Sequence, residues 1–280
     1  MEFFFELIGY GLISPAVSSA IVVVLLRLLL PAPMRRDLIV VALVAGFFVS
    51  WLLFPWAPMR PQSHWHWLPY LGLLAGVVGC LGQFSGLWLR CTIYLVLSVV
   101  TAWLLVPMWQ DLQPVRHWYL IGLVTVVWVF LLAAEPGLRN GPPPLLAAIL
   151  VGISIAAAAV LAQSGTMKFA QLAGVLVPVL ATCGLATWNW PDEFHFASIV
   201  VPFQVLLIGF LFIGYVNSFS DVPGYCYGLV GAAPLGPTAC QIPLIEKRLG
   251  GWKSLGMVGS AALLAGTDMA ASFLAVGVYF

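Results

Sequence analysis

Charged residues are the scarcest feature of this sequence. Only 8% of its 280 residues are Asp, Glu, Lys or Arg, and 62% are hydrophobic, whereas about a quarter of the residues of an ordinary soluble domain are charged. The composition therefore excludes a soluble domain and predicts one integral membrane domain, residues 1–280, whose partner is the lipid bilayer. The net charge of +1 and the lack of a basic run also exclude nucleic acid as a partner, because phosphate backbones are bound by clustered cations.

Sequence motifs of known catalytic sites are missing as well. The chain has no HExxH, no GxSxG and no Walker loop, and no DxxxD or HxxxH pair lies in an apolar segment. The five cysteines have no CxxC spacing and are expected to act as small hydrophobic residues. These absences predict a protein that is not an enzyme and that needs no cofactor.

Apolar runs of spanning length are what the sequence has in abundance. A membrane-crossing helix needs about 20 apolar residues, and the acidic, aromatic N-terminus does not resemble a signal peptide, so we expect it to begin the first helix. The sequence predicts an all-α, polytopic transmembrane helix bundle of about ten spans. They are Leu7–Leu30, Leu38–Phe54, Leu68–Leu89, Cys91–Val106, Trp118–Ala134, Leu145–Gln163, Phe169–Thr187, Ala197–Val216, Gly224–Ile245 and Ser254–Phe280.

The ninth of these segments, 224–245, is interrupted by glycine and proline. Proline in a helix interior costs about 3 kcal/mol, so we expect two short helices joined by unwound backbone between Pro234 and Pro237. Broken helices line solute sites in many transporters, which makes candidates of Gly231, Pro234, Gly236 and Pro237. A kinked packing helix without a ligand is the alternative.

The positive charges predict the topology, because Lys and Arg in short loops favour the cytoplasmic side. If 224–245 crosses the membrane, the two sides carry eight and three cations; if it does not cross, they carry five and six. The larger group is Arg27, Arg35, Arg36, Arg90, Arg139, Lys247, Arg248 and Lys253, and the smaller is Arg60, Arg116 and Lys168. This rule favours ten spans in the cell membrane with both termini non-cytoplasmic. A disulfide between Cys226 and Cys240 would contradict this topology, because the two residues would be roughly 20 Å apart on a crossing helix.

Asp268 is the strongest candidate for a functional side chain, since it lies near the middle of the last span. A carboxylate at that depth costs about 2.5 to 3.5 kcal/mol, so it is expected to face protein or water. It is either a proton or cation site in a transport path or a protonated carboxyl bonded to a neighbouring helix. A stripe of small residues shares its helix face and offers a surface for a homo- or hetero-oligomer: Ala261, Ala265, Ala271, Ser272 and Ala275.

Other polar residues in the apolar segments are fewer and weaker. Gln204 follows Pro202 by two residues and is expected to pair with a carbonyl that this proline frees. Its role is either a polar contact between helices or a part of the solute site. Gln83 and Ser85, among glycines, have the same two interpretations. His64 and His66, in QSHWHW, suit a metal only if that loop is extended, because alternate residues then point the same way.

Architecture predicts the function, because no known family is indicated. A compact bundle with short loops suggests a small-solute transporter or permease, coupled to protons through Asp268. One alternative is a non-catalytic membrane subunit or scaffold of a larger complex. A second is an intramembrane lipid-modifying enzyme, which needs at least two catalytic polar groups at one depth.

Overall fold

The computed structural model describes residues 8–54, 56, 58–81, 86–109, 112–139, 141–220, 222–240, 256–264 and 266. Every regular element in this part of the chain is a helix, and no strand occurs in it. The prediction of an all-α fold is confirmed for these residues. Asp268, Gln83 and Ser85 lie outside the described residues.

Six helices within the described ranges are long and apolar enough to cross a membrane, so the protein is membrane-embedded. The first runs from Gly9 to Leu29, as η1 (Gly9–Ile13) and α2 (Ser14–Leu29). The others are α6 (Leu87–Leu105), α7 (Arg116–Arg139), α8 (Pro143–Gln163), α9 (Met167–Asn189), and η4 (Phe196–Ile199) continued by α10 (Val200–Val216).

Two of the remaining predicted spans are shorter helices and the other two are described only in part, so helix length does not confirm a count of ten. α4 (Ile39–Leu53) has 15 residues and α5 (Leu68–Leu81) has 14, or about 22 and 21 Å at 1.5 Å per residue, against a hydrocarbon core of about 30 Å. The predicted span Leu68–Leu89 was wrong at its end, because α5 stops at Leu81 and α6 begins at Leu87. The glycine-rich sequence between Gly79 and Gly86 disfavours a helix there, although the hydrophobicity is continuous.

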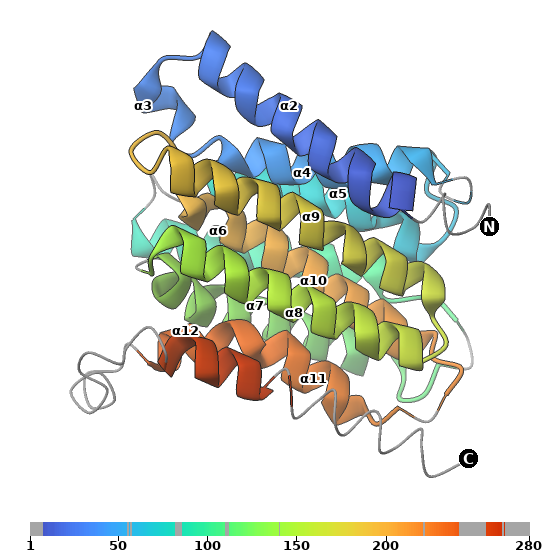
Figure 1. Ribbon diagram of the computed structural model, residues 1–280. Coiled ribbons are helices and arrows are strands. Elements are labelled where there is room, and N and C mark those ends of the chain that lie inside the picture. Colours follow the sequence, from blue (N-terminus) through green and yellow to red (C-terminus); the bar gives the residue numbers. More distant parts are fainter. Residues whose placement is uncertain are drawn as a thin grey trace.

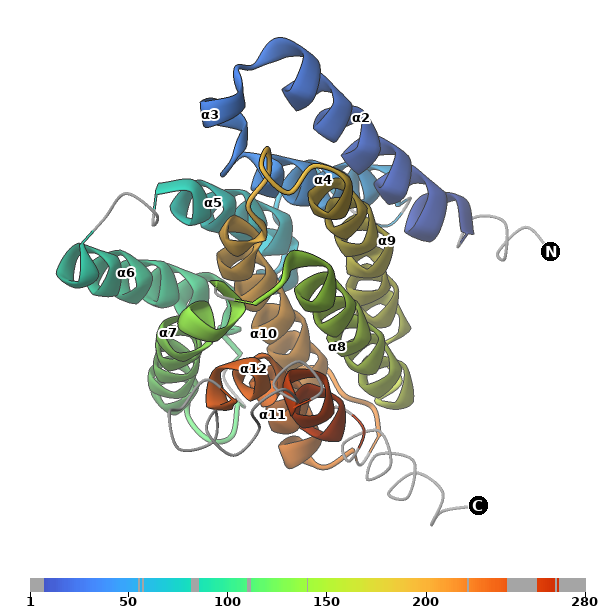
Figure 2. The ribbon, with the colours of Figure 1, turned by 60° about the vertical axis from the view of Figure 1, so that its left-hand side comes forward.

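Helix α10 is the centre of the bundle. It packs against α5, α6, α7, α8, α9 and α11 (Gly224–Ala232), which surround it in Figure 2. Every residue from Val200 to Leu211 is buried. A helix that is apolar on all faces is stable only when other helices cover all of them, which explains the position of α10.

The interrupted segment is helical from Gly224 to Ala239 and does not unwind between Pro234 and Pro237. α11 passes into the 3₁₀ turn η5 (Ala233–Leu235) and then α12 (Gly236–Ala239), and Ala233, Gly236 and Cys240 all have right-handed helical dihedral angles. The expectation of unwound backbone was wrong. Pro234 and Pro237 each lie in the first turn of a new helical piece, where the N–H that proline lacks is not needed.

Charged side chains gather at the two ends of the bundle. Successive helices run in alternate directions, so α3 (Ala32–Arg35), the α9–α10 turn and the start of α6 lie at one end, on the left in Figure 1. At that end Glu193 accepts from Arg35 at 2.7 Å and contacts Arg27 at 3.4 Å, while Arg90 and Glu135 are 2.7 Å apart. We call this the ion-paired end, and the end where α7 and α9 begin the aromatic end.

Candidate functional site

Gln204 and Gly231, both predicted as site residues, meet in the structure. The Nε2 atom of Gln204, on α10, donates to the Gly231 carbonyl at 3.2 Å, and the Gln204 side chain is fully buried. In a 3₁₀ turn the carbonyl of residue i accepts from the N–H of residue i+3, which for Gly231 would be Pro234, a residue without an N–H. The amide of Gln204 therefore bonds to a carbonyl one turn before Pro234, and not to a carbonyl near Pro202 as the sequence suggested.

The other predicted residues of the interrupted segment, Pro234, Gly236 and Pro237, are buried, and their part in a site stays a prediction. A Cβ at Gly236 would lie 2.9 Å from the backbone nitrogen of Ala261, so this glycine lets the helical segment 256–264 approach closely. The Gly/Ala face of the last helix is thus used inside the chain at Ala261, and its role in an oligomer remains a prediction.

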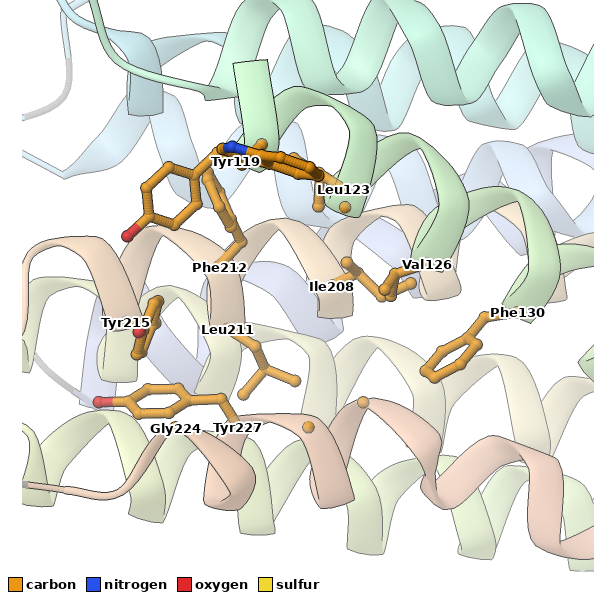
Figure 3. A pocket seen from close by; sticks show the side chains of 14 residues that line it. Tyr119, Leu123, Val126, Phe130, Ile208, Leu211, Phe212, Tyr215, Gly224 and Tyr227 are labelled. Carbon is orange, nitrogen blue, oxygen red and sulfur yellow. The ribbon is translucent and has the colours of Figure 1, made fainter. Parts of the chain in front are cut away.

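A cavity of about 440 Å³ opens between α7, α10 and α11 and reaches Gly231. Figure 3 shows it from close by, with aromatic rings at one end and aliphatic side chains along its length. Its lining is Trp118, Tyr119, Gly122, Leu123, Val126 and Phe130 from α7, Ile208, Leu211, Phe212 and Tyr215 from α10, and Gly224, Tyr227, Gly228 and Gly231 from α11. A volume of this size is typical of small-molecule sites, which span about 300 to 1,000 Å³.

The polar atoms of the cavity lie at one end of it. The Tyr119 and Tyr227 hydroxyls are together on the left of Figure 3, and Phe130 lies at the opposite end. Tyr119 donates to the Gln113 carbonyl at 2.9 Å. The hydroxyl of Tyr227, a side chain only 5% exposed, has no hydrogen-bond partner among the described residues. A buried hydroxyl without a partner costs free energy, so this end of the cavity suits a ligand with a polar group.

Glycines keep the cavity open on two of its walls. A Cβ added at Gly122 or Gly228 would have no neighbour within 4 Å, and one at Gly231 would meet Leu211 at 3.6 Å. Gly224, Gly228 and Gly231 follow the i, i+4, i+7 spacing of one helix face. This spacing was present in the sequence and was the one available signal of the cavity. The tyrosines gave no such signal, because tyrosines near helix ends usually anchor the membrane interface.

Arg116 begins α7 at the end where the tyrosines of the cavity lie. Its guanidinium lies over the Trp103 ring at 5.1 Å from the ring centre, and its Nε and Nη2 atoms have no hydrogen-bond partner within the described ranges. The four described carboxylates are elsewhere, at the ion-paired end: Asp37, Glu135, Asp192 and Glu193. Among the described residues, no carboxylate therefore pairs with Arg116.

His64 and His66 do not form the metal site that was considered for them. The HWH sequence is a 3₁₀ helix, η2 (His64–Trp67), and not the extended loop that a shared metal requires. The Nδ1 atom of His66 accepts from the backbone N–H groups of Gln62 and Ser63 at 2.9 and 3.1 Å. Burial, and in second place the neighbouring His66, lower the pKa of His64 to about 4. In the part of the chain that the structure describes, no group of three His, Cys, Asp or Glu side chains could hold a metal ion.

None of the five cysteines is joined to another by a disulfide, Cys226 and Cys240 included. The disulfide that would contradict a crossing 224–245 segment is therefore not formed.

No protein-family model matches the sequence, and a comparison with curated proteins found no matching relative. Function must therefore be argued from the residues and the geometry of this chain.

Proposed function

We propose that this protein is a multi-pass membrane carrier for a small amphipathic solute, which it holds in the cavity between α7, α10 and α11. The observation that carries the proposal is the position of this cavity, which begins at the tyrosines and ends at Gly231, beside the 3₁₀ break. Irregular helices at membrane depth commonly border solute sites. The apolar walls favour a solute with a hydrocarbon part over a wholly polar one.

Beyond the cavity, α7 and α12 are in direct contact. Thr238 of α12 donates to the Ala134 carbonyl of α7 at 3.4 Å, one helical turn past Phe130. A contact of this kind beside a solute cavity would have to break in one step of an alternating-access cycle. The interrupted segment is the proposed moving element, because its short helical pieces change orientation more easily than one long helix.

The proposed topology is ten spans in the cell membrane with both termini non-cytoplasmic. Its support is the alternation of the helices in Figure 1 and the separation of the cations between the two ends. In this topology the ion-paired end is cytoplasmic. A reporter fused after Lys253 tests it, since a non-cytoplasmic reading at that position contradicts ten spans.

Flux measurements in proteoliposomes test the carrier. Amphiphiles labelled with a fluorophore on the alkyl chain are placed in both leaflets, and an impermeant quencher reports how fast the inner-leaflet molecules reach the outside. The wild-type chain is expected to accelerate this exchange, and Gly228→Leu, which fills the cavity, is expected to abolish it. Gly174→Leu is the matched control, because Gly174 also has open space around it but does not line the cavity. Equal exchange in proteoliposomes and protein-free liposomes would refute the carrier.

Proton coupling through Asp268 is a separate part of the proposal. If it holds, Asp268→Asn removes the pH dependence of the exchange while leaving the folded protein intact. An unchanged pH profile would show that this carboxyl only bonds to a neighbouring helix.

A membrane scaffold is the second candidate function, and one cavity favours it. Between α8 and the segment 256–266 lies a space of about 310 Å³ lined mainly by small residues, among them Ala148, Gly152, Ala156 and Ala262. Small residues allow a further helix to approach closely. Co-purification of a stoichiometric partner in mild detergent, lost in Gly152→Leu, would support the scaffold in place of the carrier. We propose no covalent chemistry, because the α7–α10–α11 cavity is lined by aliphatic and aromatic side chains and glycine.

A further inference from the structure

The α7–α10–α11 cavity has smooth walls on two sides. Gly122 on α7 and Gly228 on α11 both line it, and a Cβ added at either position would meet nothing within 4 Å. Figure 3 shows α10 between these two helices, with Leu211 and Ile208 pointing into the cavity. A ligand can therefore lie against backbone on the α7 side and on the α11 side. Such walls suit a flat molecule, because no side chain projects where its faces have to pass.

The cavity is about as long as one membrane leaflet is deep. Trp118 lies near the start of α7, the usual position of a tryptophan at the membrane interface. From Trp118 to Phe130 the lining extends about 18 Å along the helix axis at 1.5 Å per residue, and half of a hydrocarbon core of about 30 Å is about 15 Å. A lipid whose polar group lies beside the tyrosines would therefore end near Phe130 and Gly231.

The tyrosine end of the cavity holds a hydroxyl group that is ready for a ligand. The Tyr227 hydroxyl is buried and has no hydrogen-bond partner among the described residues. Its ring packs edge to face against Tyr215, with 5.6 Å between the ring centres, and Tyr119 packs in the same way against Phe212 at 6.0 Å. These contacts fix the rings before a ligand arrives. One hydroxyl group on the ligand is enough to satisfy Tyr227.

A rigid ligand has an advantage over the acyl chains of the bilayer, which compete for any apolar cavity. An acyl chain gains little from the walls, because other chains already shield it in the membrane. It also loses conformational freedom when the walls hold it, whereas a fused ring system has little such freedom to lose. A hydrogen bond to Tyr227 adds to this advantage, since a buried hydroxyl without a partner costs free energy.

We infer that the cavity binds a sterol-type lipid, a flat fused-ring hydrocarbon with a single hydroxyl group. The hydroxyl pairs with Tyr227, and the rings lie between Gly122 and Gly228. The inference rests on the proposed carrier and names the class of its solute. The glycine walls supply the fit to the rings, and the hydroxyl sets the orientation.

Photolabelling of the full-length protein in proteoliposomes tests the inference. A cholesterol analogue with a diazirine in its ring system is crosslinked, and unlabelled cholesterol or oleyl alcohol competes at equal mole fraction. Cholesterol is expected to compete about tenfold better, because oleyl alcohol has the hydroxyl but a flexible chain. Equal competition by the two lipids would refute the inference. So would label found only in peptides outside α7, α10 and α11.

Filling the cavity shows whether the labelled site is this one. Gly228→Leu and, independently, Gly122→Leu are expected to reduce the labelling that cholesterol displaces about tenfold. Gly174→Leu is expected to leave it unchanged, because Gly174 has open space around it but does not line the cavity. A thermal melt confirms that each variant is folded. Unchanged labelling in both folded cavity variants would overturn the assignment.

The role of the Tyr227 hydroxyl is tested with cholest-5-ene, which has the rings of cholesterol without the hydroxyl. Tyr227→Phe is expected to lower the advantage of cholesterol over cholest-5-ene about fivefold, the effect of one neutral hydrogen bond. Tyr70→Phe is the matched control, since the Tyr70 hydroxyl donates to the Met59 carbonyl and does not line the cavity. An equal change in the two variants, or none in Tyr227→Phe, would overturn the assignment of the hydroxyl.

The sterol site and the carrier can fail separately. Cholesterol-selective labelling without accelerated exchange of amphiphiles in proteoliposomes would refute the carrier and keep this site. Accelerated exchange with equal competition by cholesterol and oleyl alcohol would refute this site and keep the carrier.

Discussion

The two ends of the bundle carry similar cations in different surroundings. At the ion-paired end, arginines contact the carboxylates of Glu193 and Glu135. Arg27 at this end also lies over the Trp190 ring. At the aromatic end, Arg116 and Lys168 lie over tryptophan rings and have no ion pair among the described residues. An ion pair uses the donors of an arginine, whereas a ring face leaves the N–H groups at the guanidinium edge available. The difference teaches that, among the described residues, carboxylates balance arginines at one end, whereas the cations of the other end rest on aromatic rings.

The largest expected effect comes from breaking the innermost ion pair. Arg90 and Glu135 are only 17% and 13% exposed, and Tyr94 also donates to Glu135 at 3.0 Å. Glu135→Leu should therefore lower the free energy of unfolding by about 2 to 3 kcal/mol, because a largely buried charge loses its partner. Denaturant titration in detergent micelles measures it. Arg116→Leu is the matched change at the aromatic end and should cost less than about 1 kcal/mol; equal losses would break the comparison of the two ends.

Acid should weaken the aromatic end before the ion-paired end. Burial lowers the pKa of His64 to about 4 from an unfolded value near 6.5, so the unfolded state binds the proton more tightly. The stability that His64 contributes is complete above pH 6.5 and is lost as the pH falls from 6.5 to 4. With screening by solvent we expect a loss of about 1 to 2 kcal/mol. Thermal melts across this range, compared with His64→Gln, measure it; an equally steep decline in the variant would exclude His64 as the cause.

The exposed ion pairs should contribute less. Glu193→Gln weakens contacts to Arg27 and Arg35, whose side chains are 43% and 17% exposed. Because solvent screens the first of these pairs, the expected cost is about 1 kcal/mol. Tryptophan fluorescence during heating reports it. Asp192 is an adjacent carboxylate without an ion pair among the described contacts. Asp192→Asn should therefore leave the melting temperature unchanged. If it lowered the melting temperature as much as Glu193→Gln does, the stability would come from the turn and not from the ion pairs of Glu193.

The smallest effect is expected between the two ends, at the centre of the bundle. Gln204→Met removes the hydrogen bond to Gly231 but also removes a buried Oε1 atom that has no partner in the described part of the chain. The two changes offset each other, so the loss should be about 0.6 kcal/mol, the average for polar contacts between membrane helices. A denaturant titration that gave more than 2 kcal/mol would show that the 3₁₀ break depends on this amide.

Much of the fold was predictable from hydrophobicity, and its exceptions have physical causes. Apolar runs located the long helices, including α8 and α9, because a membrane helix must be apolar over its whole length. The end of α5 was misplaced, since hydrophobicity is continuous through the glycines after Gly79 and does not mark the turn. Of the predicted site residues, Gln204 and Gly231 meet, while Pro234, Gly236 and Pro237 are buried and their part in a site stays a prediction.

The sequence by itself determined the membrane class, the all-α fold and the position of the interrupted segment, because composition and local backbone chemistry decide these. It also indicated the glycine face of α11. Only the tertiary structure decided that Gln204 bonds to Gly231, that Arg116 lies over Trp103, and that α7, α10 and α11 enclose a cavity. Each of these depends on residues from different helices, whose relative rotation and depth no single helix specifies.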